Sequence, residues 1–573
     1  MNRDRRQGTQ PRTRWLPRLA CCLGLLLPSL MFGEPPATRI GGYPPAQALQ
    51  LGERMYREGL LPSGKPMRAV VKGDIPLSGT TFTCVSCHLR SGLGSNEGQI
   101  ITVPTNAARL FKTDYRDYRG LSQEQRDAMA LRSLPRRPAY TEQSLATAIE
   151  AGLDPNQREL HPVMPRYDLS ANDMAVLIHY LKSLSAEPSP GVTDKVIRFA
   201  TVITDEVSQQ DREAMLVPLR NFVSRHNNIG SGEGSRMAIA RNMQEMSYAF
   251  RTIELVPWIL KGPANTWATQ LSALDSAQPV FALIGGISYG SWRPIHDFCE
   301  THRIPCILPI TDDPVVTEKD WYTLYFNKGP YQEGLAAAHY LANQVTPGQA
   351  PHLLQIFPAT PAGEALAKGF RQGWVERRLP PIKEIRLPVG KTVEARLFNP
   401  GSRSRRPPTV LLWTGAESFP ALAKAAEGPT PPSLVIMSSS QLKQNLATLP
   451  DQARPFTLIT YPFRDPKDEP RFSRKADSYI IGMTTPLNPA TRISTRAYSL
   501  IEVLQGGLGA MEQNYYRDHL LDAISTLGDQ SLADFVRLSF GPGQRYASKG
   551  CYLMQLTQGP TPELMKKSDW VVH

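Results

Sequence analysis

Cysteine is scarce in this sequence of 573 residues. Only seven cysteines are present, and two of them, Cys21 and Cys22, lie close to the N-terminus. The remaining five are too few for a disulfide scaffold, which excludes the small secreted domains whose stability depends on one. Long apolar runs are also missing, because outside the N-terminus no stretch reaches the roughly 18 to 20 apolar residues that a membrane-spanning helix requires.

A strong excess of one charge is missing as well. The formal net charge is +12, and the six arginines from Arg3 to Arg18 supply much of it. The excess in the rest of the chain is too mild for a nucleic-acid-binding surface. Hydrophobic residues make up 41% and charged residues 20% of the sequence, as in globular proteins. Because a chain of this length is too long for one hydrophobic core, we expect several domains.

The N-terminus has the layout of a secretory signal peptide, which we place at residues 1–33. Arginines precede the apolar run LACCLGLLLPSLMF at 19–32, and the polar, proline-rich GEPPATRI follows it. This run is short for a stable membrane span, so an uncleaved anchor is the alternative. The leader predicts export to a periplasm of the Gram-negative type. A retained leader would leave the protein associated with the membrane, whereas after cleavage it would not span one.

The stretch TFTCVSCHLR at 81–90 places Cys84, Cys87 and His88 within five positions. In an exported protein, C-x-x-C-H is typical of haem c attachment. Two thiols at this spacing reach the two vinyl groups on one edge of a haem, and the adjacent imidazole binds the iron. A zinc site would need two more ligands nearby, and a redox dithiol would not need the histidine. The motif therefore favours one covalently bound haem c.

A second axial ligand for the haem iron is expected downstream. Met164 precedes a proline in an apparent loop, just before an apolar pattern of helical spacing over 171–184. A thioether is a soft ligand that favours ferrous iron and raises the reduction potential. Three other side chains in this region are rival candidates: His161, Met174 and His179.

Several stretches together resemble a class I cytochrome c domain. They are AQALQLGERMYREG, the C-x-x-C-H motif, MPRY and LIHYLKSL, and the resemblance covers residues 44–187. It implies a small all-α domain in which Cys84 and Cys87 hold the haem, His88 is the proximal ligand and Met164 the distal one. The segment between His88 and Met164 is longer than in a minimal cytochrome. It is interpreted as a solvated loop and helix, or as a cover for the haem edge or a docking site.

A different pattern begins after a proline- and glycine-containing linker, which we place at 188–195. Short apolar runs such as VIRFATVI at 196–203, PVFALIGGIS at 279–288 and IPCILPIT at 304–311 alternate with segments of helical periodicity. This alternation predicts parallel α/β sheets. The segment is too long for one such sheet, so we expect two lobes.

This second part resembles a type I periplasmic binding protein of the branched-chain amino acid receptor kind, the substrate-binding component of an ABC transporter. The resemblance rests on FALIGGISYGSWRPIHDFCETHRIPCILPITDDP and RLSFGPGQRYASKGCYLMQL and covers residues 196–560. It implies a two-lobed α/β domain that closes on a small polar ligand at the C-terminal ends of the strands. The loops implied to face that ligand contain Ser288, Tyr289, Ser291, Trp292, Thr311, Asp312, Trp413, Thr414 and Glu417. The loop TDEVSQQD after the first strand lacks the small residues common in such receptors, which leaves open another ligand or a docking role.

One more cluster raises the question of a metal site. HDFCETHRIPC contains His296, Cys299, His302 and Cys306 within eleven positions. A change from helix to strand before Cys306 favours a disulfide between the two cysteines, or separate buried thiols, over a metal. The second part shows no catalytic motif, and we predict no catalytic residue.

The sequence therefore predicts an exported monohaem c-type cytochrome that transfers single electrons. Its C-terminal domain would bind a small molecule or a redox partner such as a periplasmic dehydrogenase or another cytochrome. One alternative is a periplasmic solute receptor, or a redox or gas sensor, in which the haem is a reporter. Another is a subunit of a periplasmic haem-dependent oxidoreductase. Whether the protein is an enzyme in its own right is left open.

Overall fold

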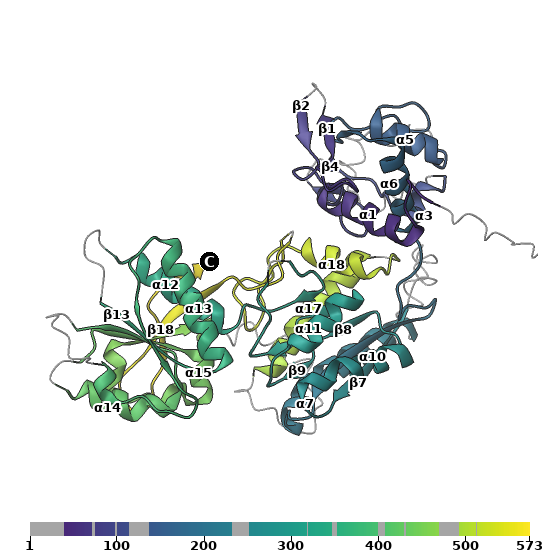
Figure 1. Ribbon diagram of the computed structural model, residues 1–573. Helices are drawn as coiled ribbons and strands as arrows, with labels where there is room; N and C mark the ends of the chain where they lie inside the picture. Colours follow the sequence, from purple (N-terminus) through teal and green to yellow (C-terminus); the bar gives the residue numbers. More distant parts are fainter. Residues whose placement is uncertain are drawn as a thin grey trace, which may run out of the picture.

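The chain is organised as a small N-terminal domain that stands on a larger, two-lobed body (Figure 1). The computed structural model describes most of the chain beyond the expected signal peptide, which lies outside the described residues. The described ranges are 39–71, 75–97, 100–113, 137–231, 251–317, 319–345, 352–398, 407–428, 431–468, 492–511, 513–541 and 543–572. None of the helices in these ranges combines the length and the apolar character that a membrane crossing requires.

Two helices form the frame of the small domain. Helix α1 (Pro45–Glu58) begins with a proline in its first turn and ends at Gly59, whose φ of 69° suits a left-handed cap. Helix α6 (Ala171–Ser183) is capped by the Ser170 side chain, which accepts from the Asp173 N–H. The two helices pack against each other and bury the apolar stripe that the sequence shows on α6.

Shorter elements complete this domain, and they correct one expectation. The helices are α2 (Val85–His88), α3 (Ala107–Leu110) and α5 (Glu142–Glu150). An antiparallel sheet joins β1 (Arg68–Val71), β2 (Ile75–Ser78) and β5 (Arg166–Asp168), and a small hairpin joins β3 (Asn96–Glu97) and β4 (Ile100–Ile101). The prediction of an all-α domain is therefore wrong in this respect. The Tyr167 side chain makes β5 part of the core, because its ring is buried and its hydroxyl donates to the Phe82 carbonyl at 2.7 Å.

The first lobe is built on a parallel sheet centred on β6 (Val196–Thr204). In the described residues its order is β11 (Ile310–Thr311), β9 (Ile287–Ser288), β6, β8 (Ala282–Ile284), β10 (Cys306–Ile307) and β12 (Thr323–Leu324), with β7 (Thr252–Leu260) also paired to β6. The helices around it are α7 (Gln209–Ser231), α10 (Trp267–Ala277), α11 (Arg293–His302), α17 (Ile493–Met511) and α18 (Arg517–Ser525). Continuous apolar strands buried on both faces are typical of such a sheet.

The second lobe holds the other large sheet. Its parallel part runs β14 (Lys383–Leu387), β13 (Leu353–Pro358), β15 (Thr409–Leu412), β16 (Leu434–Ser438) and β17 (Thr457–Tyr461). Antiparallel strands β18 (Gly550–Leu556), β19 (Leu564–Lys566) and β20 (Val571–Val572) extend it. Its helices include α12 (Pro330–Ala342), α13 (Pro361–Glu376), α14 (Phe419–Ala426) and α15 (Ser439–Leu442). Helices α12 and α13 approach so closely that a Cβ at Gly334 would lie 2.0 Å from the Leu366 carbonyl oxygen.

The expected alternation of strands and helices is thus present in two separate lobes. Chain segments connect the lobes near Tyr325, after Tyr461 and after Tyr546. The first and third connections lie side by side, because Tyr325 and Tyr546 form a parallel bridge and their rings stack at 5.9 Å between centroids. The connection after Tyr461 returns the chain to the first lobe. There α17 and α18 cover strands that lie far from them in the sequence.

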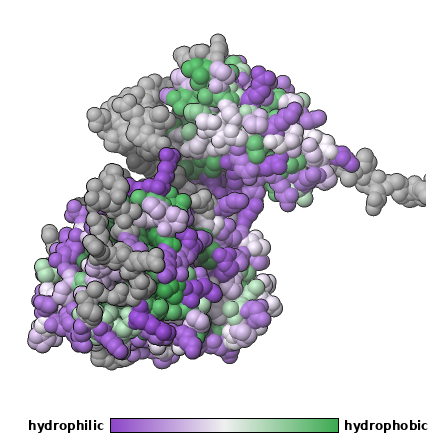
Figure 2. Space-filling view, turned by 60° about the vertical axis from the view of Figure 1, so that its left-hand side comes forward, coloured by the Kyte–Doolittle hydropathy of each residue, from purple (hydrophilic) through white to green (hydrophobic). Residues whose placement is uncertain are grey.

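The small domain rests on α18 through charged contacts. The Arg57 guanidinium on α1 pairs with Asp518 at 2.9 Å, and the Ser91 N–H donates to the Asp522 carboxylate at 2.9 Å. Beside them, Arg303 of the first lobe pairs with Glu53 at 2.8 Å. In Figure 2 hydrophilic residues lie along the visible side of this junction. Docking thus removes charges from water and compensates them with specific partners.

Asp522 should make docking depend on pH. It is only 4% exposed, and this burial, together with the neighbouring Asp518, raises its pKa to about 6. A raised carboxyl pKa means that the folded protein favours the protonated form of Asp522. Asp522 therefore contributes its full stabilisation below the unfolded-state pKa, near 4, and this stabilisation is lost as the pH rises through about 6.

We therefore expect the wild-type protein to lose up to about 3 kcal/mol of unfolding free energy between pH 4 and pH 6.5. The Asp522→Asn variant should not show this loss. Urea unfolding of the full-length protein across that range measures it. Asp529→Asn, which makes the same chemical change at an exposed position, serves as the control. A pH profile of Asp522→Asn that matches the wild-type profile would contradict the assignment.

Candidate functional site

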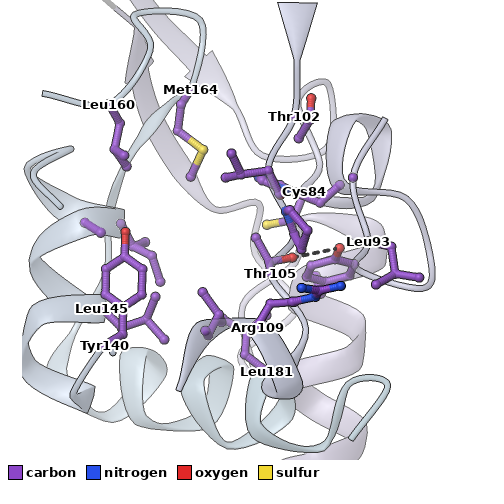
Figure 3. A pocket seen from close by; sticks show the side chains of 18 of the residues that line it. Cys84, Leu93, Thr102, Thr105, Arg109, Tyr140, Leu145, Leu160, Met164 and Leu181 are labelled. Atoms are coloured by element: carbon purple, nitrogen blue, oxygen red, sulfur yellow. Dashed lines mark hydrogen bonds between the residues drawn. The ribbon is translucent and has the colours of Figure 1, made fainter. Parts of the chain in front are cut away.

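A cavity with a volume of about 390 Å³ is lined mostly by residues of the small domain. That volume is within the range of small-molecule and cofactor pockets. Its wall is largely apolar, with aliphatic side chains from several elements: Met67, Leu93, Leu145, Ile149, Leu177 and Leu181. The predicted Cys84, His88 and Met164 also line this cavity. Figure 3 shows Cys84 and Met164 in its wall. The three predicted positions are therefore brought to one cavity although Met164 is far in sequence from the other two.

His88 is held in one tautomer by the backbone. It ends the single turn of α2, where its N–H donates to the Cys84 carbonyl at 2.9 Å. The ring Nδ1 lies 2.9 Å from the Val103 carbonyl oxygen, and a carbonyl only accepts, so Nδ1 carries the proton. Burial lowers the pKa of His88 to about 4. At neutral pH the imidazole is uncharged, and the lone pair on Nε2 is available to a metal in the cavity.

The two cysteines of the motif differ in their surroundings. Cys84 lines the cavity, and burial raises the pKa of its thiol to about 12. Cys87 is exposed, and neither cysteine is part of a disulfide. A catalytic dithiol needs an exposed thiolate with a lowered pKa, so the protonated Cys84 is a poor match for redox exchange. Nor do the described residues place three His, Cys, Asp or Glu side chains together as a zinc site would require.

Met164 reaches the cavity from a loop between α5 and β5. Its N–H donates to the His161 carbonyl at 2.9 Å, and its own carbonyl accepts from the Arg166 guanidinium. Figure 3 shows its thioether facing Cys84 across the cavity. The rival His161 lies on the same loop but is exposed.

The other two rivals sit on α6, outside the cavity wall. Met174 is 5% exposed in the helix core, and His179 is half-buried on the same helix. The predicted positions therefore bring a thiol, a neutral imidazole and a thioether to the cavity, and Met67 and His519 line it as well. These groups fit a covalently bound haem c, with Cys84 and Cys87 as the thiols and His88 and Met164 as the axial ligands.

Part of the cavity wall comes from the larger domain, and sequence reasoning missed it. Ala510 at the end of α17, Asn514 in the following loop and His519 on α18 all line the cavity. In the sequence, most strands of both lobes lie between Leu181 and these three residues. Leu181 is the nearest other wall residue. No local pattern marks them, because only the docking of α18 on the small domain brings them there.

The predicted ligand loops of the first lobe are only partly accessible. Ser288 is buried, and its hydroxyl donates to Glu206 at 3.2 Å. Tyr289 is exposed and donates to Asp211, and Ser291 is exposed at the start of α11. Trp292 is fully buried among the core residues of this lobe, so its ring is not accessible to a ligand in this arrangement, and its ligand contact stays a prediction. The large apolar ring packs behind the loop instead of covering a ligand in front of it.

The second lobe gives a similar result. Trp413 is fully buried, and its indole N–H donates to the Gln355 side chain at 2.8 Å, so its ligand contact likewise stays a prediction. Thr414 is buried, and its hydroxyl has no partner among the described residues. Glu417 is exposed but accepts from the Gly415 N–H at 2.8 Å, which shapes the turn before α14.

Thr311 and Asp312 do line a hollow between the two lobes. Ser440, Phe463 and Arg496 line it from other segments, and sequence reasoning missed these three. The volume is about 30 Å³, which suffices for about one water molecule. The hollow is therefore too small for a metabolite in this arrangement of the lobes.

A buried carboxylate holds the second-lobe side of this hollow in place. Glu333 on α12 is fully buried and accepts hydrogen bonds from the start of α15, including the Ser440 hydroxyl. Its donors include the Ser438 hydroxyl at 3.0 Å, the Ser439 N–H at 3.1 Å and the Thr460 hydroxyl at 2.6 Å. Burial raises the pKa of Glu333, while these donors favour its ionised form. The start of α15 is thus fixed to α12 rather than free to follow a ligand.

The cluster in HDFCETHRIPC is structural in the described residues. His296 bridges the Tyr325 hydroxyl at 3.0 Å and the Asp320 carboxylate at 2.8 Å. Cys299 and Cys306 are fully buried thiols that are not joined by a disulfide. The metal interpretation has no support here, since no three ligands converge within the described part of the chain.

Comparisons with known proteins concern the larger domain. A sequence model of the periplasmic binding protein family matches residues 227–560. Among similar solved structures, an ABC transporter substrate-binding protein from Sphaerobacter thermophilus is 16% identical, with a TM-score of 0.47, and covers 66% of this chain and 98% of its own. A branched-chain amino acid ABC transporter protein from Thermus thermophilus with bound valine is 11% identical, with a TM-score of 0.47 and coverages of 66% and 97%. A type 1 periplasmic binding protein from Bordetella pertussis Tohama I is 14% identical, with a TM-score of 0.46 and coverages of 65% and 100%. A search of the curated proteins finds no match.

The role of Glu333 can be tested by Glu333→Gln. The amide replaces one acceptor oxygen with a donor that faces serine hydroxyls, so we expect the second lobe to lose about 2–4 kcal/mol of stability. Hydrogen exchange of α12 and β16 in the full-length protein measures this locally. Glu364→Gln, which removes an exposed carboxylate paired with Arg386, should cost less than about 1 kcal/mol. Equal losses in the two variants would refute the structural role.

Proposed function

Because this chain belongs to the periplasmic binding protein family, we propose that it is an exported protein that binds a small molecule between the lobes of its larger domain and carries one covalent haem c in its smaller domain. The proposal places the mature protein in the periplasm. It assigns the small domain to single-electron transfer with a periplasmic redox partner, such as a dehydrogenase or another cytochrome. The observation that carries it is the shared cavity of Cys84, His88 and Met164.

The residues of the small domain divide the work of holding the cofactor. Cys84 and Cys87 would supply the two thioether links, and the Nε2 of His88 would bind the iron from one side. The Met164 sulfur, held by its loop, would bind from the other side. A haem bound here supplies reversible one-electron chemistry, and the apolar wall keeps water away from the iron, which together with the thioether favours the ferrous state.

A second candidate role is favoured by helix α17. Arg496 near its start lines the hollow between the lobes, and Ala510 near its end lines the cavity of the small domain. One rigid element thus touches both candidate sites. This connection supports a receptor in which the small domain reports ligand binding, or senses redox state or a gas.

Attachment of the cofactor is the first test. We expect the full-length protein, expressed with haem c maturation machinery, to show a c-type absorption spectrum and an intact mass increased by one haem. The Cys84→Ala/Cys87→Ala variant should show neither. The same variant should keep the fold of the larger domain, since both cysteines lie in the small one. Absence of added mass in the wild-type protein would end the cofactor proposal and leave a two-lobed binding protein.

The axial ligand is tested by Met164→Ala against His161→Ala. Loss of the thioether should abolish the weak sulfur-to-iron charge-transfer band of the ferric protein and lower its reduction potential, because a soft ligand of ferrous iron is removed. His161→Ala should leave both unchanged, since that side chain is exposed. Visible spectroscopy and redox potentiometry measure the two effects. An unchanged spectrum for Met164→Ala would favour the sensor role, with an open coordination position.

A further inference from the structure

The larger domain closes one end of the cavity with polar side chains. His519 and Asn514, from the segment that joins α17 to α18, line the same cavity as Arg109 of the small domain. Arg109 also lies close enough to Tyr516 to influence that phenol electrostatically, so both domains meet at this end. The rest of the wall is mostly aliphatic, which makes the polar end a distinct feature.

His519 lines the cavity, and one of its ring nitrogens has no hydrogen-bond partner among the described residues. Its Nδ1 lies 2.8 Å from the Asn514 carbonyl oxygen, and because a carbonyl only accepts, Nδ1 is the donor. Among the described residues Nε2 makes no hydrogen bond. Burial lowers the pKa of His519, and the hydrogen bond to the Asn514 carbonyl offsets only part of this effect. The ring is oriented by the backbone and lacks a second partner within the described part of the chain.

Arg109 supplies an uncompensated positive charge at the same end. Its guanidinium forms no ion pair among the described residues, and Arg137 donates to its carbonyl at 3.0 Å. Among the described residues, Asp154 contributes a carboxylate to the cavity wall. This carboxylate is already paired with Arg158 at 2.7 Å. The described wall thus has a positive end without a matching anion, and a group with a carboxylate would satisfy it.

We propose that the larger domain completes the cofactor site, with His519 and Arg109 holding one carboxylate of the bound haem from opposite sides of the domain junction. This inference rests on the proposed function, because a haem is the carboxylate-bearing occupant that Cys84, His88 and Met164 imply. His519 and Arg109 are positioning residues in this scheme. With an anion beside it, Nε2 of His519 takes up a proton and becomes the second donor of the imidazolium.

The docking contacts make such shared binding possible. The segment before α18 is fixed to the linker, since the Arg517 N–H donates to the Ser189 hydroxyl at 2.9 Å. The pair between Arg57 and Asp518 fixes α18 itself to the small domain. His519, next to Asp518, therefore has a defined position relative to the cavity. Binding of the haem carboxylate and docking of the domains should stabilise each other by linkage.

The test compares the reduction potentials of holo full-length variants. His519→Leu removes a cationic partner of the carboxylate and leaves its negative charge to stabilise ferric iron. We expect the equilibrium constant for reduction to fall about tenfold, equivalent to about 59 mV for one electron. His302→Leu is the matched control, because its Nδ1 is also bound to a carbonyl, at 3.0 Å from Phe298, but it does not line the cavity. The control should keep the wild-type potential.

Arg109→Met should shift the potential in the same direction, and the double variant should shift it by less than the sum of the two, as expected for two partners of one carboxylate. Limited proteolysis in the linker should be faster for Cys84→Ala/Cys87→Ala than for the holo protein. Should His519→Leu fail to fold, Arg109→Met and the proteolysis decide. If the wild-type protein carries haem but His519→Leu and Arg109→Met have the same reduction potential as His302→Leu, this inference alone is overturned. If the wild-type protein carries no haem, the proposed function is overturned.

Discussion

The arrangement of the two sites depends on one buried contact, the ion pair between Arg57 on α1 and Asp518 on α18. Both side chains are less than one-fifth exposed, so neither charge is stable there without the other. Such pairs contribute little net stability compared with apolar packing, but they penalise every alternative orientation that separates the partners. The surrounding charges reinforce this, since Glu53 binds both Arg57 and Arg303. The contact thereby decides which surface of the larger domain faces the cavity.

Local chemistry made half of the cavity predictable. The spacing of Cys84, Cys87 and His88 is read directly from the sequence, and Met164 follows from its position before a capped helix. The wall formed by Ala510, Asn514 and His519 had no such signal, because its approach depends on contacts between the two ends of the chain, such as that of Ser91 with Asp522. Cofactor attachment itself stays a prediction.

In the larger domain the sequence predicted the fold, but it did not predict the directions of individual side chains. Alternating apolar strands and helices correctly predicted two α/β lobes, because that pattern reports burial on both faces of a parallel sheet. The same pattern did not reveal the burial of Trp292 and Trp413, which were assigned to ligand contact because they follow strands. Each ring is instead enclosed by its own lobe, and the Trp413 N–H is satisfied by Gln355. Position after a strand indicates proximity to the cleft, but the direction of a side chain is decided by packing.

The hollow between the lobes must enlarge before a metabolite can enter. An ionic contact across it, Lys443 to Asp312 at 3.1 Å, joins two side chains that are each more than half exposed, so it contributes at most about 1 kcal/mol. The start of α15 is anchored to Glu333 and moves with its lobe. On the other side, Arg496 belongs to α17, whose helical path from there to Ala510 covers about 21 Å at the usual rise per residue. A rigid helix transmits a displacement at one end to the other, so a ligand that moves Arg496 changes the wall of the cavity. By thermodynamic reciprocity, any change that the cavity imposes on α17 must alter ligand affinity in the hollow by the same factor.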